Sequence, residues 1–473
     1  MRPHELPGAP RAIPAFDWTG AAVRRALDLP AREDSDGLRF DRVITDTRIA
    51  APNDLFVALT GERFDGHDYL DVAASAGVRA AVVSRAVECG GDLIQYRVPD
   101  TLVALGDLAG FRRDALPARV VGITGSSGKT GTKEYTQAAV GSELRVHATA
   151  ANLNNRIGVP LTLLAAPVGA EVLVVEMGTN EPGEIHKLTR IAKPEVAIVT
   201  TVSESHLAGL GDLAGVMREK LAIFEQLPSN GVAVVGESPS TLADSARALG
   251  VDVQVAGMGP GADPHLRATD LSQDEQGRWS FTWRGARARL ARPGRHEVGN
   301  AALALAAAEV LGVDPQGALD AITQVQPGSM RGEILRLGEL RLIVDCYNAN
   351  PQSTAAALTT VRDWPSAARR VAILGSMLEL GPRSEALHRE LLTEAVSGGI
   401  DLVIATGLYA EVGGTEIAGG VRLEIVPEVA DVAAILETQI DAGDVVLLKG
   451  SRGVRLEQLI PAMRDQFGAG EVD

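Results

Sequence analysis

The sequence predicts an α/β protein with three domains, and three observations support this prediction. The chain has 473 residues, a length that suggests about three domains. Hydrophobic residues make up 45% of it but aromatic residues only 4%, which favours helices packed closely on sheets. From about residue 118 onward, short runs of Val, Ile, Leu and Ala alternate with helical patterns, as is typical of parallel strands buried on both faces.

The apolar runs and the breaks between them define four segments. A Pro-rich loose arm without a signal-peptide apolar region comes first, and Leu116-Pro117-Ala118 is a plausible linker. We expect the arm at 1–16, a smaller N-terminal α/β domain at 17–116, a central domain at 117–325 and a C-terminal domain at 326–473.

Charge and cysteine content exclude several classes of function. The formal net charge is −16, which argues against non-specific nucleic-acid binding because that requires a basic surface. Cys89 and Cys346 are too few for a disulfide framework or a zinc site. No apolar run approaches the length of a membrane span. We therefore expect a cytoplasmic protein.

In the first segment, Asp46-Thr47-Arg48 follows a strand-like run. A carboxylate, a hydroxyl and a guanidinium at a strand end could hold a sugar, a uracil or a diphosphate. Taken alone, the tripeptide favours the alternative, a solvated turn.

The central segment opens with a phosphate-binding loop. A buried strand at Val120–Thr124 is followed by the turn Gly125-Ser126-Ser127-Gly128, then by Lys129 and Thr130 at the start of a helix. Glycines let backbone N–H groups surround phosphates, and the helix N-terminus adds partial positive charge. Lys129 is placed to reach the terminal phosphates, and the Thr130 hydroxyl is placed to bind Mg²⁺. We expect a P-loop-type domain with a mainly parallel sheet and helices on both faces.

One position departs from the general phosphate-loop pattern. That pattern has Gly where this chain has Ile123, so the loop is a shortened variant. The alternative interpretation is a glycine turn before a helix, with a solvated lysine.

Polar residues follow the next two predicted strands. Glu176 ends a strand at about 172–177, and His206 comes after a strand at about 196–201. Because ligands bind beyond the carboxyl ends of parallel strands, we expect Thr130, Glu176 and His206 to converge on one edge. A hydroxyl, a carboxylate and an imidazole form a reasonable shell for Mg²⁺ or Mn²⁺.

Three further stretches of the central segment carry polar side chains. Clustered amides with an arginine suit a substrate that has peptide groups, or else form an Asn-rich turn. A predicted amphipathic helix at 214–227 carries Lys220 beside its apolar face, the spacing of an ordinary solvated lysine. His296 and Asn300 open an Ala-rich helix, where they could bind ligand or simply cap it. The amide cluster consists of Asn152, Asn154, Asn155 and Arg156.

The third segment is again α/β, with predicted strands at about 340–346, 371–374, 402–405 and 445–448. We expect a Rossmann-like domain whose strand ends form a second ligand-bearing edge. Asp345 lies at the first of these ends, followed by Tyr347-Asn348-Ala349-Asn350-Pro351.

Taken together, these motifs resemble those of the Mur ligases of peptidoglycan synthesis, over about residues 41–457. ITGSSGKT is similar to the shortened phosphate loop of that family, and NLNNRIGVPLTLL, EMGTNEPGEI and SHLAGLGDLAGVMREK follow in the family's order. DTR and FDGHDYL resemble its UDP-binding domain. YNANP and MLELG point to the branch that adds D-alanyl-D-alanine to UDP-N-acetylmuramoyl-tripeptide.

The resemblance implies a role for each matching residue. Gly125, Ser126, Ser127, Gly128, Lys129, Thr130 and Gly131 would hold the ATP phosphates, and His296, Asn300, Arg331 and Asp345 would complete the nucleotide site. Thr130, Glu176, His206 and a carbamylated Lys220 would bind two Mg²⁺ ions, with Mn²⁺ as a possible substitute. Lys129, Lys220 and His206 would be the catalytic residues. Asp46, Thr47 and Arg48 would bind UDP; Asn152, Asn154, Asn155 and Arg156 the tripeptide; Asn348, Asn350 and Ser353 the dipeptide.

The implied reaction is ATP-dependent amide-bond formation through an acyl phosphate, releasing ADP and phosphate. The rival interpretations are a Mur ligase that adds the third residue, a folylpolyglutamate-synthetase-like ligase and, farther away, a P-loop ATPase switch. We expect a monomer. Three positions depart from the family's usual residues: Glu297 replaces Asn, Ser376 replaces Asp, and Thr47 replaces Ser.

Overall fold

The computed structural model describes residues 18–90, 92–413, 421–468 and 471–472, so the predicted arm at 1–16 lies outside the described residues. The described chain divides into two compact units. The first contains residues up to 122 together with 144–177 and 186–195, and the second contains 123–143, 178–185 and 196 onward. The division crosses the central segment.

The first unit contains a parallel four-stranded sheet in the order β3-β4-β5-β6. Its central strands are buried along their whole length, as expected for a sheet covered on both faces. Asp100 caps the long helix α4 by accepting hydrogen bonds from two backbone N–H groups. The elements are β1 (Trp18–Thr19), α1 (Gly20–Ala26), α2 (Glu33–Asp36), β2 (Arg39–Phe40), β3 (Arg42–Ile44), η1 (Thr47–Ile49), β4 (Asp54–Val57), η2 (Gly66–Tyr69), α3 (Leu70–Ser75), β5 (Ala80–Val83), β6 (Ile94–Arg97) and α4 (Thr101–Ala115).

The central segment contains a six-stranded sheet in the order β12-β11-β10-β7-β9-β8. The pairings β8–β9, β10–β11 and β11–β12 are all parallel, as predicted. Its strands are β7 (Arg119–Thr124), β8 (Val146–Ala148), β9 (Val172–Glu176), β10 (Val196–Val199), β11 (Val232–Val235) and β12 (Asp252–Val255). Its helices are α5 (Lys129–Gly141), α6 (Gly158–Leu164), α7 (Glu184–Ala192), α8 (Leu207–Leu210), α9 (Leu213–Leu221), η3 (Ala222–Phe224), α10 (Leu242–Arg247), η4 (Pro264–Leu266), α11 (His296–Val310) and α12 (Pro315–Ile322).

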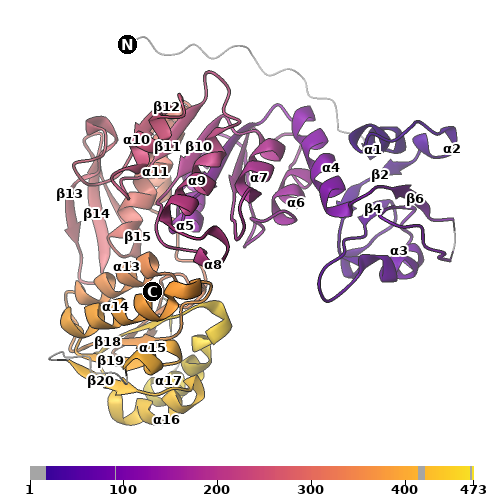
Figure 1. Cartoon of the computed structure of the whole chain (residues 1–473). Helices are drawn as coiled ribbons and strands as arrows, with labels where there is room; N and C mark the ends of the chain where they lie inside the picture. Colours follow the sequence, from indigo (N-terminus) through magenta and orange to yellow (C-terminus); the bar gives the residue numbers. More distant parts are fainter. Residues whose placement is uncertain (1–17, 91, 414–420, 469–470, 473) are drawn as a thin grey trace. The chain divides into compact units, whose positions relative to one another are not determined.

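A three-stranded antiparallel sheet lies between α10 and α11 along the chain and was not predicted. It consists of β13 (Thr269–Gln273), β14 (Arg278–Trp283) and β15 (Ala286–Pro293), seen beside α11 in Figure 1. Polar and apolar residues alternate along β14, and β13 is mostly polar, whereas the predicted strands were continuous apolar runs.

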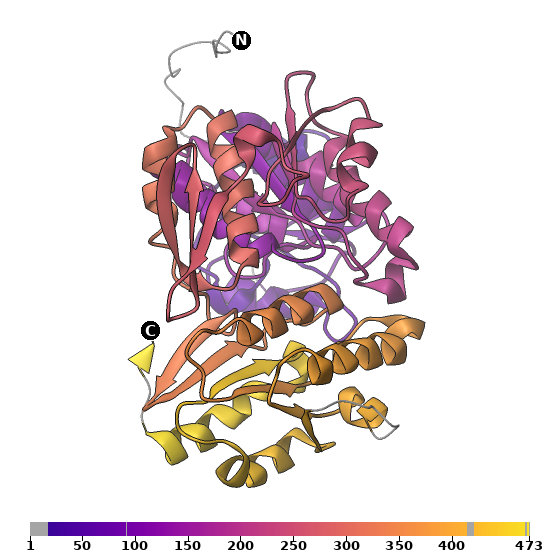
Figure 2. The ribbon, with the colours of Figure 1, turned by 90° about the vertical axis from the view of Figure 1, so that its left-hand side faces the viewer.

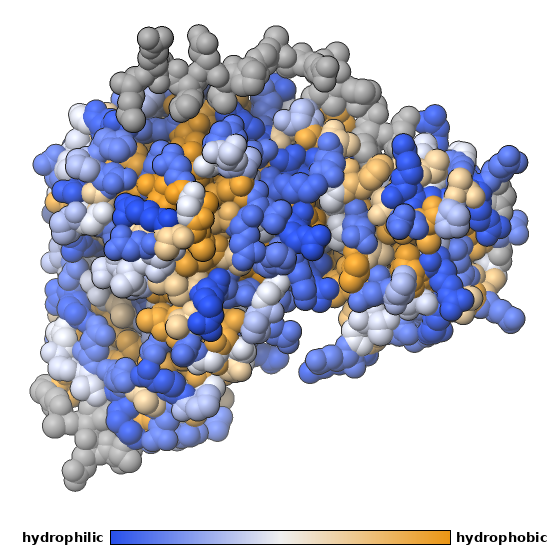
Figure 3. All heavy atoms as spheres, turned by 45° about the horizontal axis from the view of Figure 1, so that its top comes forward, coloured by the Kyte–Doolittle hydropathy of each residue, from blue (hydrophilic) through white to orange (hydrophobic). Residues whose placement is uncertain are grey.

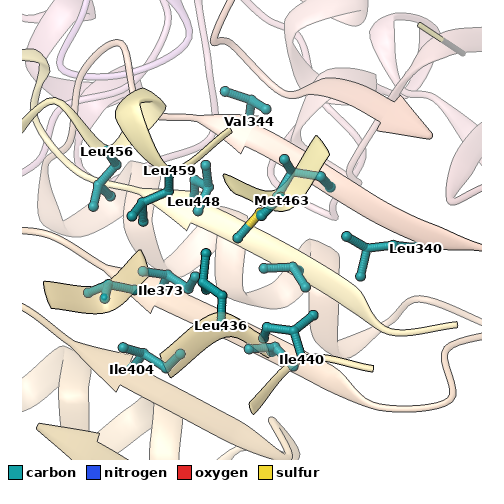
Figure 4. Close-up of a cluster of buried hydrophobic side chains, with 14 of the residues drawn as sticks. Leu340, Val344, Ile373, Ile404, Leu436, Ile440, Leu448, Leu456, Leu459 and Met463 are labelled. Atoms are coloured by element: carbon teal, nitrogen blue, oxygen red, sulfur yellow. The ribbon is translucent and has the colours of Figure 1, made fainter. Parts of the chain in front are cut away.

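The third segment forms a seven-stranded sheet in the order β20-β19-β18-β21-β17-β16-β22. The five strands from β20 to β17 are parallel, and β16 pairs antiparallel with β17 on one side and with β22 on the other. Helices cover both faces of this sheet in Figure 2, and a cluster that includes Leu342, Ile404 and Leu448 fills the side toward α16 and α17, part of which Figure 4 shows. The elements are β16 (Glu333–Leu337), β17 (Leu340–Asp345), α13 (Pro351–Arg362), β18 (Arg370–Leu374), η5 (Gly381–Arg383), α14 (Ser384–Ser397), β19 (Leu402–Ala405), α15 (Leu408–Gly413), β20 (Arg422–Ile425), α16 (Val429–Gln439), β21 (Val445–Lys449), η6 (Arg452–Val454), η7 (Leu456–Leu459), α17 (Ile460–Phe467) and β22 (Glu471–Val472).

Among the described residues, no helix is both long and apolar enough to cross a membrane. The face drawn in Figure 3 carries hydrophilic side chains over much of its area, interleaved with apolar ones.

Candidate functional site

The phosphate loop between β7 and α5 has a backbone that its glycines make possible. Gly128 has φ +82°, and a Cβ there would lie 2.4 Å from the Asn300 side-chain oxygen. A Cβ on Gly125 would lie 1.9 Å from the hydroxyl of Thr200. Any larger residue would have to displace these neighbours, so the loop is narrow and closely supported.

Hydrogen bonds hold the loop in place from two sides. The Ser126 hydroxyl exchanges hydrogen bonds with the backbone of Ser203, both at 3.0 Å, and accepts one from the Ser205 hydroxyl at 2.9 Å. The Lys129 ammonium donates to the carbonyl of Gly125 at 2.8 Å. The loop is therefore joined to the segment that leads to His206.

Lys220 is completely buried, so the solvated lysine that its spacing indicated is wrong. Its Nζ has no hydrogen-bond partner. Burial lowers the pKa of Lys220 well below its ordinary value, and the positive charge of Lys129 lowers it further. The structure thus brings together two lysines that lie 91 positions apart in the sequence, and burial disfavours the charged form of Lys220.

The preceding residue, Glu219, is a supporting group that sequence reasoning missed. Its buried carboxylate accepts hydrogen bonds from Gly183 N at 2.6 Å, Ile185 N at 2.8 Å and the Thr179 hydroxyl at 3.2 Å. It therefore holds the segment 178–185 against α9. Its position in a helix that was expected to pack on a core was the feature of the sequence that could have indicated a structural role.

Glu176 and the amide cluster lie in the first unit. The Glu176 side chain accepts a hydrogen bond from Asn154 Nδ2 at 2.8 Å, and its backbone N–H donates to the Thr149 hydroxyl at 3.0 Å. Asn155 accepts from the first N–H groups of α6, so part of the cluster caps that helix. Asn152 is exposed and Arg156 half-buried.

His206 and Glu379 face each other in the second unit, and both have left-handed backbones, with φ of 52° and 66°. His206 Nδ1 lies 2.8 Å from the Glu379 carboxylate. Glu379 belongs to the MLELG motif, and no role was predicted for this residue from the sequence. An ion pair between Arg383 and Glu204 joins the same two loops.

His296 and Asn300 lie near the phosphate loop at the start of α11. The Asn300 side chain packs against Gly128 and Gly131. Desolvation by the surrounding atoms would lower the pKa of His296, but the Glu297 carboxylate, 3.5 Å away, outweighs this effect and raises the pKa. Burial alone would raise the pKa of Glu297, but the hydrogen bond from His296 and the charge of Arg292 lower it to about 2. Glu297, a departure from the family, is thus a compensated buried charge.

Most candidate residues of the third segment make contacts within the protein. Asn350 and Ser353 form a capping box at the start of α13, and Asn350 Nδ2 also donates to the Ser126 carbonyl at 3.1 Å.

The Lys449 ammonium donates to Asp345 and to the Asn348 carbonyl, both at 2.8 Å. Arg331 stacks 3.9 Å from the Tyr347 ring centre. Ser376, where the family has Asp, accepts a hydrogen bond from Leu408 N.

In the first unit, Asp46 caps η1 and forms a surface ion pair with Arg48, whose side chain is 87% exposed. Thr47 is half-buried at the start of the same turn. These contacts leave the Arg48 guanidinium at the surface.

The candidate metal-binding residues near the phosphate loop fit a divalent cation that takes most of its ligands from phosphates and water. Among the described residues, no three His, Cys, Asp or Glu side chains gather in a cluster able to hold a metal ion. Mg²⁺ needs no such cluster, since it is usually bound through one or two protein ligands plus phosphates and water. The unpartnered Lys220 Nζ is an orphaned buried group, which a carbamate would convert into an oxygen ligand.

Three family models match the chain in succession. The Mur ligase family catalytic domain matches residues 40–113, the Mur ligase middle domain 123–308, and the Mur ligase glutamate ligase domain 330–452. The chain belongs to the Mur ligase family.

Individual relatives of this Mur ligase cover almost its whole length. A UDP-N-acetylmuramoyl-tripeptide–D-alanyl-D-alanine ligase of Bacillus subtilis is 36% identical over 88% of this chain and 92% of its own. The enzyme of the same name from Escherichia coli is 36% identical over 90% and 94%.

Solved structures resemble this Mur ligase over the same extent. MurF from Acinetobacter baumannii has a TM-score of 0.86 at 28% identity, covering 96% of this chain and all of its own. MurF from Thermotoga maritima, solved in complex with ADP, has a TM-score of 0.80 at 28% identity, covering 90% and 97%. The predicted three-domain α/β fold is confirmed as that of the Mur ligases.

Proposed function

We propose that this Mur ligase adds D-alanyl-D-alanine to UDP-N-acetylmuramoyl-tripeptide, consuming ATP and releasing ADP and phosphate, in peptidoglycan precursor synthesis. The relatives that carry this name match nearly the whole chain. The observation that carries the chemistry is the buried, unpartnered amine of Lys220 beside the phosphate-loop Lys129. An ATPase switch would not need a buried amine without a hydrogen-bond partner next to its phosphates.

The site residues are assigned as part of this proposal. Gly125, Ser126, Ser127, Gly128, Lys129, Thr130 and Gly131 hold the phosphates of ATP, and His296, Asn300, Arg331 and Asp345 complete its site. Asp46, Thr47 and Arg48 take UDP; Asn152, Asn154, Asn155 and Arg156 take the tripeptide. Asn348, Asn350 and Ser353 take the dipeptide. The capping bonds of Asn350 and Ser353 leave Asn348 as the best supported of these three.

Thr130, Glu176, His206 and carbamylated Lys220 are proposed to hold two Mg²⁺ ions. Carbamylation requires a neutral amine, and the burial of Lys220 favours that form by lowering its pKa. When bound, the ions neutralise the charge that develops on the transferring phosphoryl group.

The chain's own residues address the main obstacle to this reaction, which is the repulsion between a carboxylate and a γ-phosphate. Lys129 places a positive charge at the phosphates, and the backbone N–H groups of the loop bind their oxygens. The tripeptide carboxylate attacks the γ-phosphorus and ADP departs, giving an acyl phosphate. The dipeptide amine then attacks the acyl carbon, phosphate leaves, and the ammonium proton is released to solvent.

An acyl phosphate must be kept from water. Within the second unit, the third segment contacts the phosphate loop through Asn350 and the His206 loop through Glu379. We assign to these contacts the exclusion of water during the reaction. We further propose that the domains span 17–116, 117–325 and 326–473, and that the enzyme acts as a cytoplasmic monomer.

Acceptor dependence tests the proposed function. ADP release with ATP and UDP-tripeptide should require D-alanyl-D-alanine, and free diaminopimelate, lysine or glutamate should not replace it. Turnover with one of those amino acids would instead identify a third-residue-adding or folylpolyglutamate-synthetase-like ligase. ATP hydrolysis independent of any acceptor would identify an ATPase switch.

A further inference from the structure

The contact between His206 and Glu379 gives the MLELG loop a function at the proposed metal site. The Glu379 carboxylate can only accept a hydrogen bond, so the nitrogen 2.8 Å away, His206 Nδ1, carries the proton. Nε2 is then the nitrogen with a free lone pair, the one able to bind a cation. A ligating histidine ordinarily donates its other N–H to such a carboxylate or carbonyl, which fixes the tautomer and orients the ring.

The loop that carries Glu379 is held rigidly by its own domain. Met377 N donates to His388 Nε2 at 2.9 Å, and Leu378 N donates to the Ser451 hydroxyl at 3.0 Å. His388 is fully buried, and its Nδ1 lies 2.6 Å from the Ser384 carbonyl, so its ring is fixed at both nitrogens. The position of Glu379 is therefore determined by the third segment and not by His206.

The opposite side of this loop meets the His206 segment closely. The Glu379 carbonyl accepts from Ala208 N at 3.4 Å, and a Cβ on Gly381 would lie 3.2 Å from the Ala208 backbone. Both His206 and Glu379 hold left-handed backbones, which cost roughly 1 kcal/mol or more for a residue with a side chain. Such conformations persist where the surrounding structure imposes them, and here they aim two side chains at each other.

We propose that Glu379 is a positioning residue: its carboxylate, delivered by the third segment, selects the Nδ1–H tautomer of His206 and orients Nε2 for the divalent cation. Docking of the MLELG loop thereby completes the metal site. This inference rests on the proposed function for the metal role of His206.

The test compares Mn²⁺ binding, measured by EPR in the presence of ADP, between the parent and three variants. Glu379→Ala should weaken Mn²⁺ binding about tenfold, the lower end of the effect of removing such a partner. Glu379→Gln keeps an acceptor and should give an intermediate loss. Arg383→Ala is the matched control, because it breaks the neighbouring ion pair between the same two loops without touching His206; its affinity should stay within twofold of the parent's.

Nitrogen chemical shifts of ¹⁵N-histidine-labelled enzyme provide a second readout, with His206 assigned by its loss in His206→Gln. The metal-free parent should show Nδ1–H at His206, and Glu379→Ala a mixture of tautomers. Unchanged Mn²⁺ affinity in Glu379→Ala would overturn the inference. Equal weakening of Mn²⁺ binding by Arg383→Ala would also overturn it. A Glu379→Ala variant that raised only the KM for the dipeptide would instead make Glu379 an acceptor for the dipeptide ammonium, and would overturn it as well.

These outcomes remain distinct from failure of the proposed function. A parent enzyme that forms no amide from the three substrates refutes the proposed function directly. The Mn²⁺ affinities and tautomers of the variants decide the role of Glu379 separately.

Discussion

Burial makes it costly to charge Lys220, and the charge of Lys129 would repel a charged Lys220 further. Both effects favour the neutral amine, which is the form that reacts with CO₂. The helical pattern around Lys220 could not reveal this, because periodicity places a residue on a face but does not say what packs over that face. The resemblance to the family implied a role for Lys220, whereas only the structure showed that the side chain is buried.

Lys220→Ala should lower the rate of ADP release at least 100-fold, since it removes the proposed carbamate. Formate or acetate should restore part of the activity by supplying a carboxylate in the space left by the side chain. Lys187→Ala, which alters an exposed lysine, is the control and should keep the parent rate. Ligation by Lys220→Ala at the parent rate would remove the carbamate from the account.

Glu297 should make the stability of the enzyme depend on acid pH. Its pKa is lowered from 4.5 to about 2 in the folded protein, so its contribution is present above pH 4.5 and is lost as the pH falls toward 2. Between pH 5 and pH 3, the free energy of unfolding of the parent should fall about 2 kcal/mol more than that of Glu297→Gln. Urea unfolding measures this difference.

The exposed Glu275 provides the comparison for that experiment. Glu275→Gln should follow the parent across the same pH range. A Glu297→Gln curve parallel to the parent's would show that the buried network does not hold this carboxylate ionised.

At the scale of elements, the strands that bear the site were predictable and the supporting ones were not. The sequence predicted the strands that end at Glu176 and Asp345 because they are continuous apolar runs before polar residues. It missed β16, a short strand in which Arg336 interrupts the apolar run, next to the edge strand β22. The left-handed residues His206 and Glu379 were also unpredictable, since tertiary contacts impose them.

A comparison of Gly128, in the phosphate loop, with Gly250, outside it, distinguishes the effect of backbone strain from that of steric crowding. Both have left-handed φ values, of +82° and +77°, but only Gly128 faces a neighbour that a Cβ would strike. Gly128→Ala should weaken ADP binding at least tenfold because it displaces Asn300. Gly250→Ala should cost about 1 kcal/mol of stability and leave ADP binding unchanged. Calorimetric titration with ADP distinguishes them, and equal ADP affinities would contradict the assignment of the loop.

At the scale of the whole molecule, the proposed reaction draws on residues from all three segments of the chain. The phosphate loop and Lys220 belong to the central segment, and the loops that meet it in the second unit come from the third. The first unit carries the surface proposed for UDP. Sequence patterns predicted the separate strand ends, whereas the pairing of Asn350 with Ser126, and of Glu379 with His206, required the fold.

The most direct test of this account uses UDP-tripeptide labelled with ¹⁸O in its terminal carboxylate, together with ATP and D-alanyl-D-alanine. Mass spectrometry should find the amide product, lighter than the sum of the two substrates by one water, and one ¹⁸O per molecule in the released phosphate. Phosphate without the label would contradict an acyl-phosphate ligase, even if ATP were consumed.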